Sequence, residues 1–228
     1  MPYAAAVPRL VRDDPDRPDP GLAELYASLP DAVELEPWLG WCREADRVLY
    51  LGVGAGRLAV PLVRAGVRLV GVDAHPGMIA HLQRRLPDLE LYLARIEDLD
   101  LGRSFDLVMA PAGILCHADR LRGAARHACG RVALELVNPH WLLAGAGPGV
   151  RARRLEAGRV EVQVSHPGGW VESATIPLVW PEQIEAFLAS AGLELCRMQG
   201  DGDAGLEGSP TFYVLAARRA RRARMPST

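Results

Sequence analysis

The residues best suited to ligand binding lie in one short segment that contains three glycines and an acid. Gly52, Gly54 and Gly56 alternate with other residues, and Asp73 closes the next apolar run. A backbone without Cβ atoms can approach a ligand closely, and the free N–H groups of a following helix attract a carboxylate or phosphate. The Asp73 carboxylate is suited to accept hydrogen bonds from two ribose hydroxyls. Together these residues predict a site for an adenosine-containing ligand.

The elements that must position these residues follow from the hydrophobic pattern. The run at 48–51 predicts a strand that ends at the first glycine, residues 58–63 have helical spacing, and the run at 69–72 predicts a second strand. Strand, glycine loop, helix and strand form the first half of a nucleotide-binding α/β unit. Arg57 stands where the dinucleotide fingerprint needs its third glycine, and the lysine of a P-loop is missing. The spacing therefore disfavours both of those nucleotide-binding motifs.

The same segment resembles motifs I and II of the class I S-adenosylmethionine-dependent methyltransferases. The resemblance covers LGVGAGRLAVPL, the acid after the second strand and the HPGMI sequence at 75–79. It implies S-adenosyl-L-methionine as the cofactor, with contacts from the three glycines, Asp73, Ala74 and Met78. Core packing is the other interpretation of Met78, because it falls on the apolar face of the helix expected after Pro76.

Two later segments extend the resemblance. RIEDL at 95–99 aligns with the motif that holds the adenine, which implies contacts from Ile96 and Glu97. SFDLVMA resembles motif IV, whose last residue, Ala110, would line the slot where the methionine part meets the acceptor.

Two positions depart from the family pattern. Arg95 replaces the acid that commonly receives the adenine amino group, and Tyr50 replaces the acid that commonly holds the methionine ammonium through water. These departures concern side chains and leave the backbone contacts of the loop in place.

Two histidines follow predicted strands and are the candidate catalytic residues. His117 opens the helix after the fourth strand, and His140 follows the fifth strand together with Asn138. Imidazole is the side chain best suited to accept a proton near neutral pH, and the carboxyl ends of parallel strands are where α/β sheets bind ligands. A solvent-facing helix start and a simple turn are the equal alternatives for His117 and His140.

The whole pattern predicts an α/β protein with a Rossmann-like class I methyltransferase fold. We expect a seven-stranded, mostly parallel sheet whose last strand is antiparallel, because PEQIEAFLASAGLELCRMQGDGD and SPTFYVLAARR resemble the C-terminal part of that family. Residues 1–45 predict an N-terminal arm with helices, of which the first twenty, rich in Pro and Asp, are expected to be irregular. Residues 46–228 form the predicted cofactor-binding domain. Strand-like alternation at 149–177 predicts a small antiparallel β insertion, a meander that forms a lid.

Composition bears on the binding partners and the cellular location that can be expected. The 228 residues carry a formal net charge of −2, so the net charge does not indicate binding to nucleic acid or to a membrane surface. The four cysteines are far apart, which predicts neither a disulfide framework nor a metal site. No apolar run is long enough for a membrane span, so we expect a cytoplasmic protein.

The resemblance to the class I methyltransferases thus implies transfer of a methyl group to an O, N or C atom of a small-molecule acceptor. An NAD(P)-type oxidoreductase and a non-catalytic methyltransferase-like scaffold that binds the cofactor are the alternatives. A membrane partner is not expected and nucleic acid is disfavoured; a homodimer stays open.

Overall fold

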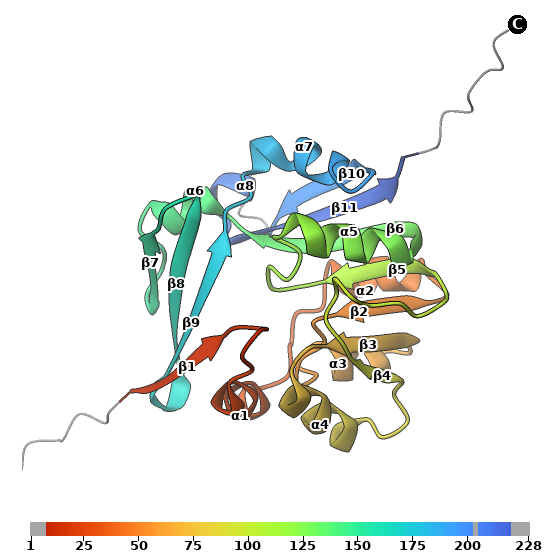
Figure 1. The fold of residues 1–228 in the computed structure, drawn as a ribbon, viewed down its shortest axis with the longest axis horizontal. Helices are drawn as coiled ribbons and strands as arrows, with labels where there is room; N and C mark the ends of the chain where they lie inside the picture. The colour runs from red at the N-terminus through yellow and green to blue at the C-terminus, as the bar shows by residue number, and fades with distance from the viewer. Residues whose placement is uncertain (1–7, 203–204, 220–228) are drawn as a thin grey trace, which may run out of the picture.

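The computed structural model describes residues 8–202 and 205–219, in which a seven-stranded sheet lies between two layers of helices (Figure 1). Its neighbouring strands are parallel except around β11, which is antiparallel to both β6 and β10. This confirms the predicted fold. The strands, in the order of the sheet, are β10 (Leu193–Gly200), β11 (Thr211–Arg218), β6 (Ala128–Val137), β5 (Phe105–Ala110), β2 (Val48–Leu51), β3 (Leu69–Asp73) and β4 (Leu91–Leu93).

Both faces of the sheet are buried, which explains the unbroken apolar runs in its central strands. Successive side chains of a strand point to opposite faces. In β2, Leu49 and Leu51 therefore join one core cluster while Val48 and Tyr50 join the other. The first cluster packs under α5 (Ala118–His127) and α7 (Ile184–Ala189), and the second under α2 (Trp38–Arg43), α3 (Ala59–Arg64) and α4 (Pro76–Arg85).

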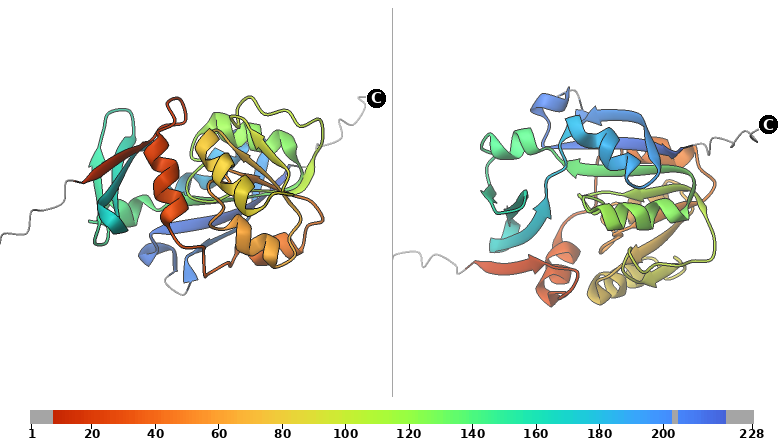
Figure 2. Two further views of the ribbon diagram at one scale, coloured as in Figure 1. Left: turned by 90° about the horizontal axis from the view of Figure 1, so that it is seen from below. Right: turned by 45° about the horizontal axis from the view of Figure 1, so that its top comes forward.

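A second, four-stranded sheet stands beside the edge at which the parallel strands end (Figures 1 and 2). Short helix α6 (Pro139–Leu143) leads from β6 into it. Three of its strands pair antiparallel as the predicted meander: β7 (Val150–Arg154), β8 (Arg159–His166) and β9 (Trp170–Pro177). Helix α8 (Gly205–Gly208) precedes the last strand of the main sheet.

The fourth strand of the small sheet comes from the N-terminal arm. β1 (Arg9–Asp13) pairs parallel with β9, so the expectation of an irregular arm is wrong for these five residues. The arm then turns into α1 (Pro20–Ser28), where Asp19 caps the helix by accepting the N–H of Gly21 at 2.9 Å. The first seven residues of the predicted arm and the last nine residues of the chain lie outside the described residues.

A third, small apolar cluster fixes the arm against the glycine loop. It joins Val11 of β1 and Leu25 of α1 to Ala55 of the loop and Met78 of α4. Met78 is only 5 % exposed, so packing accounts for most of its surface. No helix in the described part of the chain combines the length and apolar character needed to cross a membrane.

Candidate functional site

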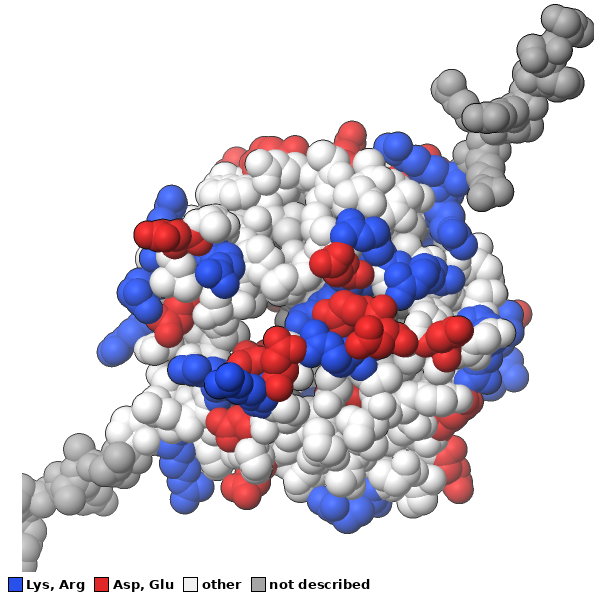
Figure 3. All heavy atoms as spheres, in the orientation of Figure 1, with Lys and Arg blue, Asp and Glu red and all other residues white. Residues whose placement is uncertain are grey.

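One cavity lies where the parallel strands end, between the main sheet, the arm and the small sheet. Its volume is about 200 Å³, and the space-filling view shows the hollow with charged side chains of both signs along its rim (Figure 3). Larger hollows of about 900 and 820 Å³ lie near the amino ends of the strands and beside α6. Ligands of α/β sheets bind at the carboxyl ends, so the smaller cavity is the candidate site. The arm forms one of its walls, and displacement of the arm would enlarge it.

The glycine loop contributes an open stretch of backbone to this cavity. Gly52 and Gly54 line it and have φ angles of 69° and 59°, which side-chain-bearing residues rarely adopt. A Cβ atom built on Gly54 would meet nothing within 4 Å, so the space beside this backbone is free for a ligand. Gly56 has a different task, because its Cβ would lie 2.5 Å from a methyl group of Leu82. Gly56 allows α4 to pack against the loop and does not line the cavity.

Asp73 lies at the end of β3 beside this loop and lines the cavity. Its two carboxylate oxygens accept the N–H groups of Gly54 and His75, each at 2.8 Å. A carboxylate has about four acceptor positions, so each oxygen keeps one for a ligand hydroxyl. Burial raises the pKa of Asp73, and the backbone hydrogen bonds oppose that rise.

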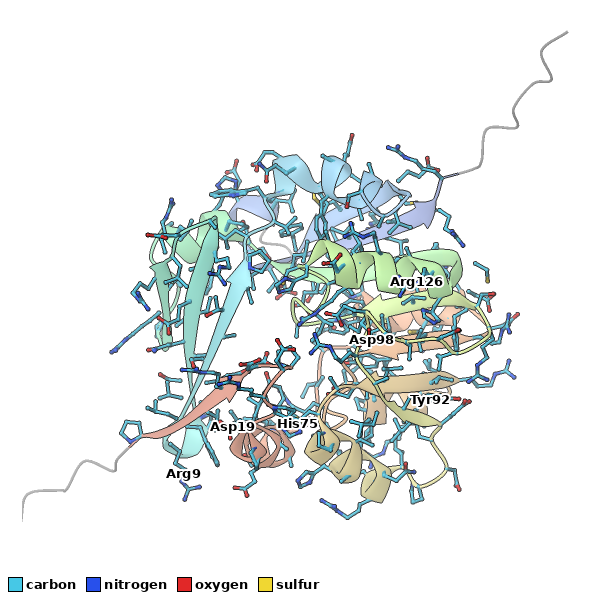
Figure 4. All side chains as sticks on the ribbon, viewed as in Figure 1. Arg9, Asp19, His75, Tyr92, Asp98 and Arg126 are labelled. Carbon is cyan, nitrogen blue, oxygen red and sulfur yellow. The ribbon has the colours of Figure 1, made fainter. Side chains whose placement is uncertain are left out.

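His75 connects the arm to the site. Figure 4 shows it beside Asp19 of the arm. Its Nδ1 accepts the N–H of Gly77 at 3.1 Å, so the ring proton resides on Nε2, which donates to the carbonyl of Asp19 at 2.9 Å. The HPGMI sequence therefore couples the start of α4 to the cap of α1. Ala74, the residue before His75, also lines the cavity.

The opposite wall is formed by the segment after β4. Ile96 and Glu97, for which the resemblance implied contacts with the adenine, both line the cavity. Glu97 accepts a hydrogen bond from Nε of Arg120 on α5 at 3.2 Å. Arg95, the departure from the family pattern, forms an ion pair with Asp16 of the arm and lies 3.6 Å from Glu97.

The turn after β5 differs in detail from the expectation. Ala110 is fully buried and does not line the cavity; Ala112 and Ile114 do. Ala112 has a φ of 56°, and its N–H donates to the carboxylate of Glu135 at 2.9 Å. Glu135 thus holds the turn in a conformation that brings backbone to the cavity wall.

The two candidate histidines lie in different places. His117 precedes α5 and lines the cavity, and burial followed by the charge of Arg120 lowers its pKa. A lowered pKa favours the neutral imidazole, which is the form that can accept a proton. His140 instead lines the hollow beside α6, where its Nε2 lies 2.8 Å from Glu182. Asn138 is fully buried and caps α6 while its amide donates to carbonyls at 206 and 209, so its role is structural.

Other cavity-lining residues lacked a sequence signal strong enough to single them out. Asp13 at the end of β1 and the 174–176 segment of β9 enter the site through pairing between distant segments, which no local motif encodes. Tyr26 of α1 also lines the cavity.

Comparison with known families agrees with this geometry. Residues 48–133, which include the glycine loop, Asp73 and the start of β6, match the family model described as a methyltransferase domain. This segment is therefore similar to a methyltransferase domain. The arm, the small sheet and the last two strands of the main sheet lie outside the matched segment.

One curated relative and two solved structures illustrate what the chain is similar to. A ubiquinone biosynthesis O-methyltransferase of Azorhizobium caulinodans is 28% identical over 181 residues, which is 75% of this chain and 65% of that enzyme. A methyltransferase structure from Clostridium acetobutylicum has a TM-score of 0.65 at 15% identity, covering 82% and 93% of the two chains. A Micromonospora echinaspora amino pentose methyltransferase with bound S-adenosylmethionine has a TM-score of 0.56 at 21% identity, covering 79% and 87%. These likenesses between structures concern the fold.

Proposed function

We propose that this protein transfers a methyl group from S-adenosyl-L-methionine to a small-molecule acceptor held between the glycine loop and the small sheet. The observation that carries the proposal is the free space beside the Gly54 backbone, next to a carboxylate that has acceptor positions to spare. We further propose residues 46–228 as the cofactor-binding unit and 149–177 as its lid, with residues 1–45 completing the wall of the cavity.

The described residues fit the cofactor. Backbone at Gly52 and Gly54 would hold the amino-acid end, Asp73 would accept the ribose hydroxyls, and Ile96 with Glu97 would flank the adenine. Ala74 and Met78 would contact the nucleoside from the start of α4. When bound, the cofactor supplies an electrophilic methyl carbon on a positively charged sulfur.

The protein's own contribution is alignment and exclusion of water. Closing the cavity with β1, α1 and β9 would place the accepting atom against the methyl carbon. His117 is the histidine positioned to take a proton from an acidic acceptor, since it lines the cavity and burial lowers its pKa, which favours the neutral imidazole. His140 is not proposed for this role, because it lies in another hollow and pairs with Glu182.

Ligand-dependent stability separates this proposal from the alternatives. S-adenosylhomocysteine should raise the melting temperature by mass action and NAD should not. Arg57, whose guanidinium donates to the carbonyl of Pro30, occupies the third glycine position that NAD binding needs. Stabilisation by NAD alone would overturn the proposal. Tight binding of S-adenosylhomocysteine without methylation across a broad acceptor panel would favour a scaffold.

A further inference from the structure

The arm and the small sheet, which lie outside the cofactor motifs, build one wall of the cavity. Asp13 ends β1, Tyr26 projects from α1, and Ala174 to Ile176 belong to β9, which lies beside β1 (Figure 1). If the glycine loop and β3 hold the cofactor, this wall faces the acceptor. Its chemistry therefore indicates what the acceptor is.

The charged residues that line the cavity are predominantly acidic. Four carboxylates, those of Asp13, Asp14, Asp73 and Glu97, stand against the two guanidinium groups of Arg95 and Arg120. Both arginines already have acidic partners, Asp16 and Glu97. The cavity is thus poorly suited to an anionic acceptor. Strand β7, which carries three arginines, is exposed and does not line the cavity.

Three of the four carboxylates already have hydrogen-bond or ion-pair partners. Asp73 accepts two backbone N–H groups, Glu97 pairs with Arg120, and Asp14 accepts the N–H of Asp16 at 2.9 Å. Within residues 8–202 and 205–219, the Asp13 side chain makes no hydrogen bond or ion pair. Asp13 is therefore the one of these four carboxylates that has no partner among the described residues, and both of its oxygens are available to a ligand.

A hydrogen-bonded network holds the wall around Asp13 in place. The hydroxyl of Tyr26 donates to Glu172 of β9 at 3.0 Å, and the other oxygen of Glu172 lies 2.8 Å from Nε2 of His166 on β8. Glu172 is only 9 % exposed and does not line the cavity. This network joins α1 to two strands of the small sheet, so the backbone that carries Asp13 is supported from both sides.

We propose that the acceptor is a basic amine and that Asp13 binds its ammonium group and then receives its proton. The inference rests on the proposed methyl transfer. Apolar Leu22, Ile176 and the Tyr26 ring line the same cavity and suit a compact, uncharged frame around the amine.

The step combines a proton transfer to Asp13 with methyl transfer to the amine nitrogen, and it requires no other reactant. The ammonium R–NH₃⁺ gives one proton to the Asp13 carboxylate and becomes R–NH₂. The nitrogen lone pair then forms a bond to the methyl carbon, and the electron pair of the carbon–sulfur bond passes to sulfur, leaving a neutral thioether and R–NH₂CH₃⁺. The proton on Asp13 leaves to water, which regenerates the carboxylate.

The surroundings of Asp13 suit a proton acceptor. The residue lines the cavity, and partial burial there raises its pKa to about 6, with the charge of Glu172 adding to the rise. Amine binding should weaken as the pH falls below about 6, where Asp13 becomes protonated and loses its charge. The groups that face it from other elements are Glu172, Arg120, Asp73 and Tyr26, together with its neighbour Asp14.

Asp13 has one rival role, because the methyl donor also carries positive charge. If Asp13 served the ammonium of the donor, its loss would weaken binding of S-adenosylhomocysteine, which has the same ammonium. If Asp13 serves the acceptor, S-adenosylhomocysteine should bind the Asp13→Asn variant as it binds the wild type.

The experiment is calorimetry on the full chain loaded with S-adenosylhomocysteine. The probes are matched cyclohexyl and benzyl compounds that carry an amine, a hydroxyl or a carboxylate. We expect heat from the amines only, and at least a tenfold weaker amine affinity in Asp13→Asn, with the loss of affinity below pH 6 abolished. As a control, Glu24→Gln removes an exposed carboxylate from α1. It should change neither the affinity for S-adenosylhomocysteine nor the affinity for the amines.

The outcomes distinguish the two proposals. Absence of heat from S-adenosylhomocysteine itself would refute the proposed function. Normal binding of S-adenosylhomocysteine with equal affinity for the hydroxyl or carboxylate probes, or without heat from any amine, would refute the amine proposal alone. Weakened S-adenosylhomocysteine binding in Asp13→Asn would assign Asp13 to the donor and also overturn it.

Discussion

Replacement of Asp73 by asparagine tests the cofactor site most directly. Asparagine retains one oxygen and replaces the other with an NH₂ group, so it can accept only one of the two N–H groups now bonded to Asp73. The other N–H would face a donor, and one ribose hydroxyl would lose its acceptor. A hydrogen bond to a charged group contributes about 1.5–3 kcal/mol. Since 1.4 kcal/mol is a factor of ten, we expect S-adenosylhomocysteine to bind about 10- to 100-fold more weakly.

The unliganded fold should respond much less. Burial raises the pKa of Asp73, so the folded protein holds this proton more tightly than the unfolded chain, and stability falls as the pH rises through that range. Asparagine does not ionise, so it removes the cost of burying a charged carboxylate. It also leaves one of the two backbone N–H groups without an acceptor. Because the two effects oppose each other, we expect the free energy of unfolding to change by no more than about 1.5 kcal/mol.

Calorimetry with S-adenosylhomocysteine and urea unfolding of the unliganded chain measure the two quantities separately. Asp106→Asn is the matched control, because Asp106 also accepts a backbone N–H, from Arg47 at 2.9 Å, but lies at the amino end of β5. Its affinity for the ligand should equal that of the wild type. An Asp73→Asn variant that is folded and binds with unchanged affinity would refute the assignment of Asp73 to the ribose.

Three further predictions concern the packing and hydrogen bonds of the main sheet and its connections. Gly130→Ala would place a Cβ 2.4 Å from a main-chain oxygen of β5, so urea unfolding should show a loss of about 1–3 kcal/mol, and full stability would contradict this packing. Asn138→Ala removes the cap of α6 and two hydrogen bonds to the carbonyls at 206 and 209, which should cost about 2–4 kcal/mol; a loss below 1 kcal/mol would argue against the structural role. Burial raises the pKa of Glu135, so stability falls as the pH rises through its titration, and Glu135→Gln should flatten a plot of Tm against pH; an unchanged slope would show that another group titrates.

The sequence determined the parts of this protein that depend on short-range geometry. The apolar runs, the glycines and Asp73 follow one another within a single α/β unit, and backbone geometry fixes where each lies relative to the next. The same reasoning predicted the meander, because alternation and turn residues act over a few positions. It also placed His117 at the start of a helix beside the site.

The tertiary structure decided which distant residues meet. The sequence RLVRD has one buried residue, Val11, and became a strand only because the edge of β9 offered unpaired backbone groups. His117 and His140 both follow strands of one sheet, yet the small sheet and α6 place them in separate hollows. Asp13 reached the cavity by the same long-range pairing. Local spacing cannot encode such meetings, because they depend on which edges and faces the rest of the chain leaves uncovered.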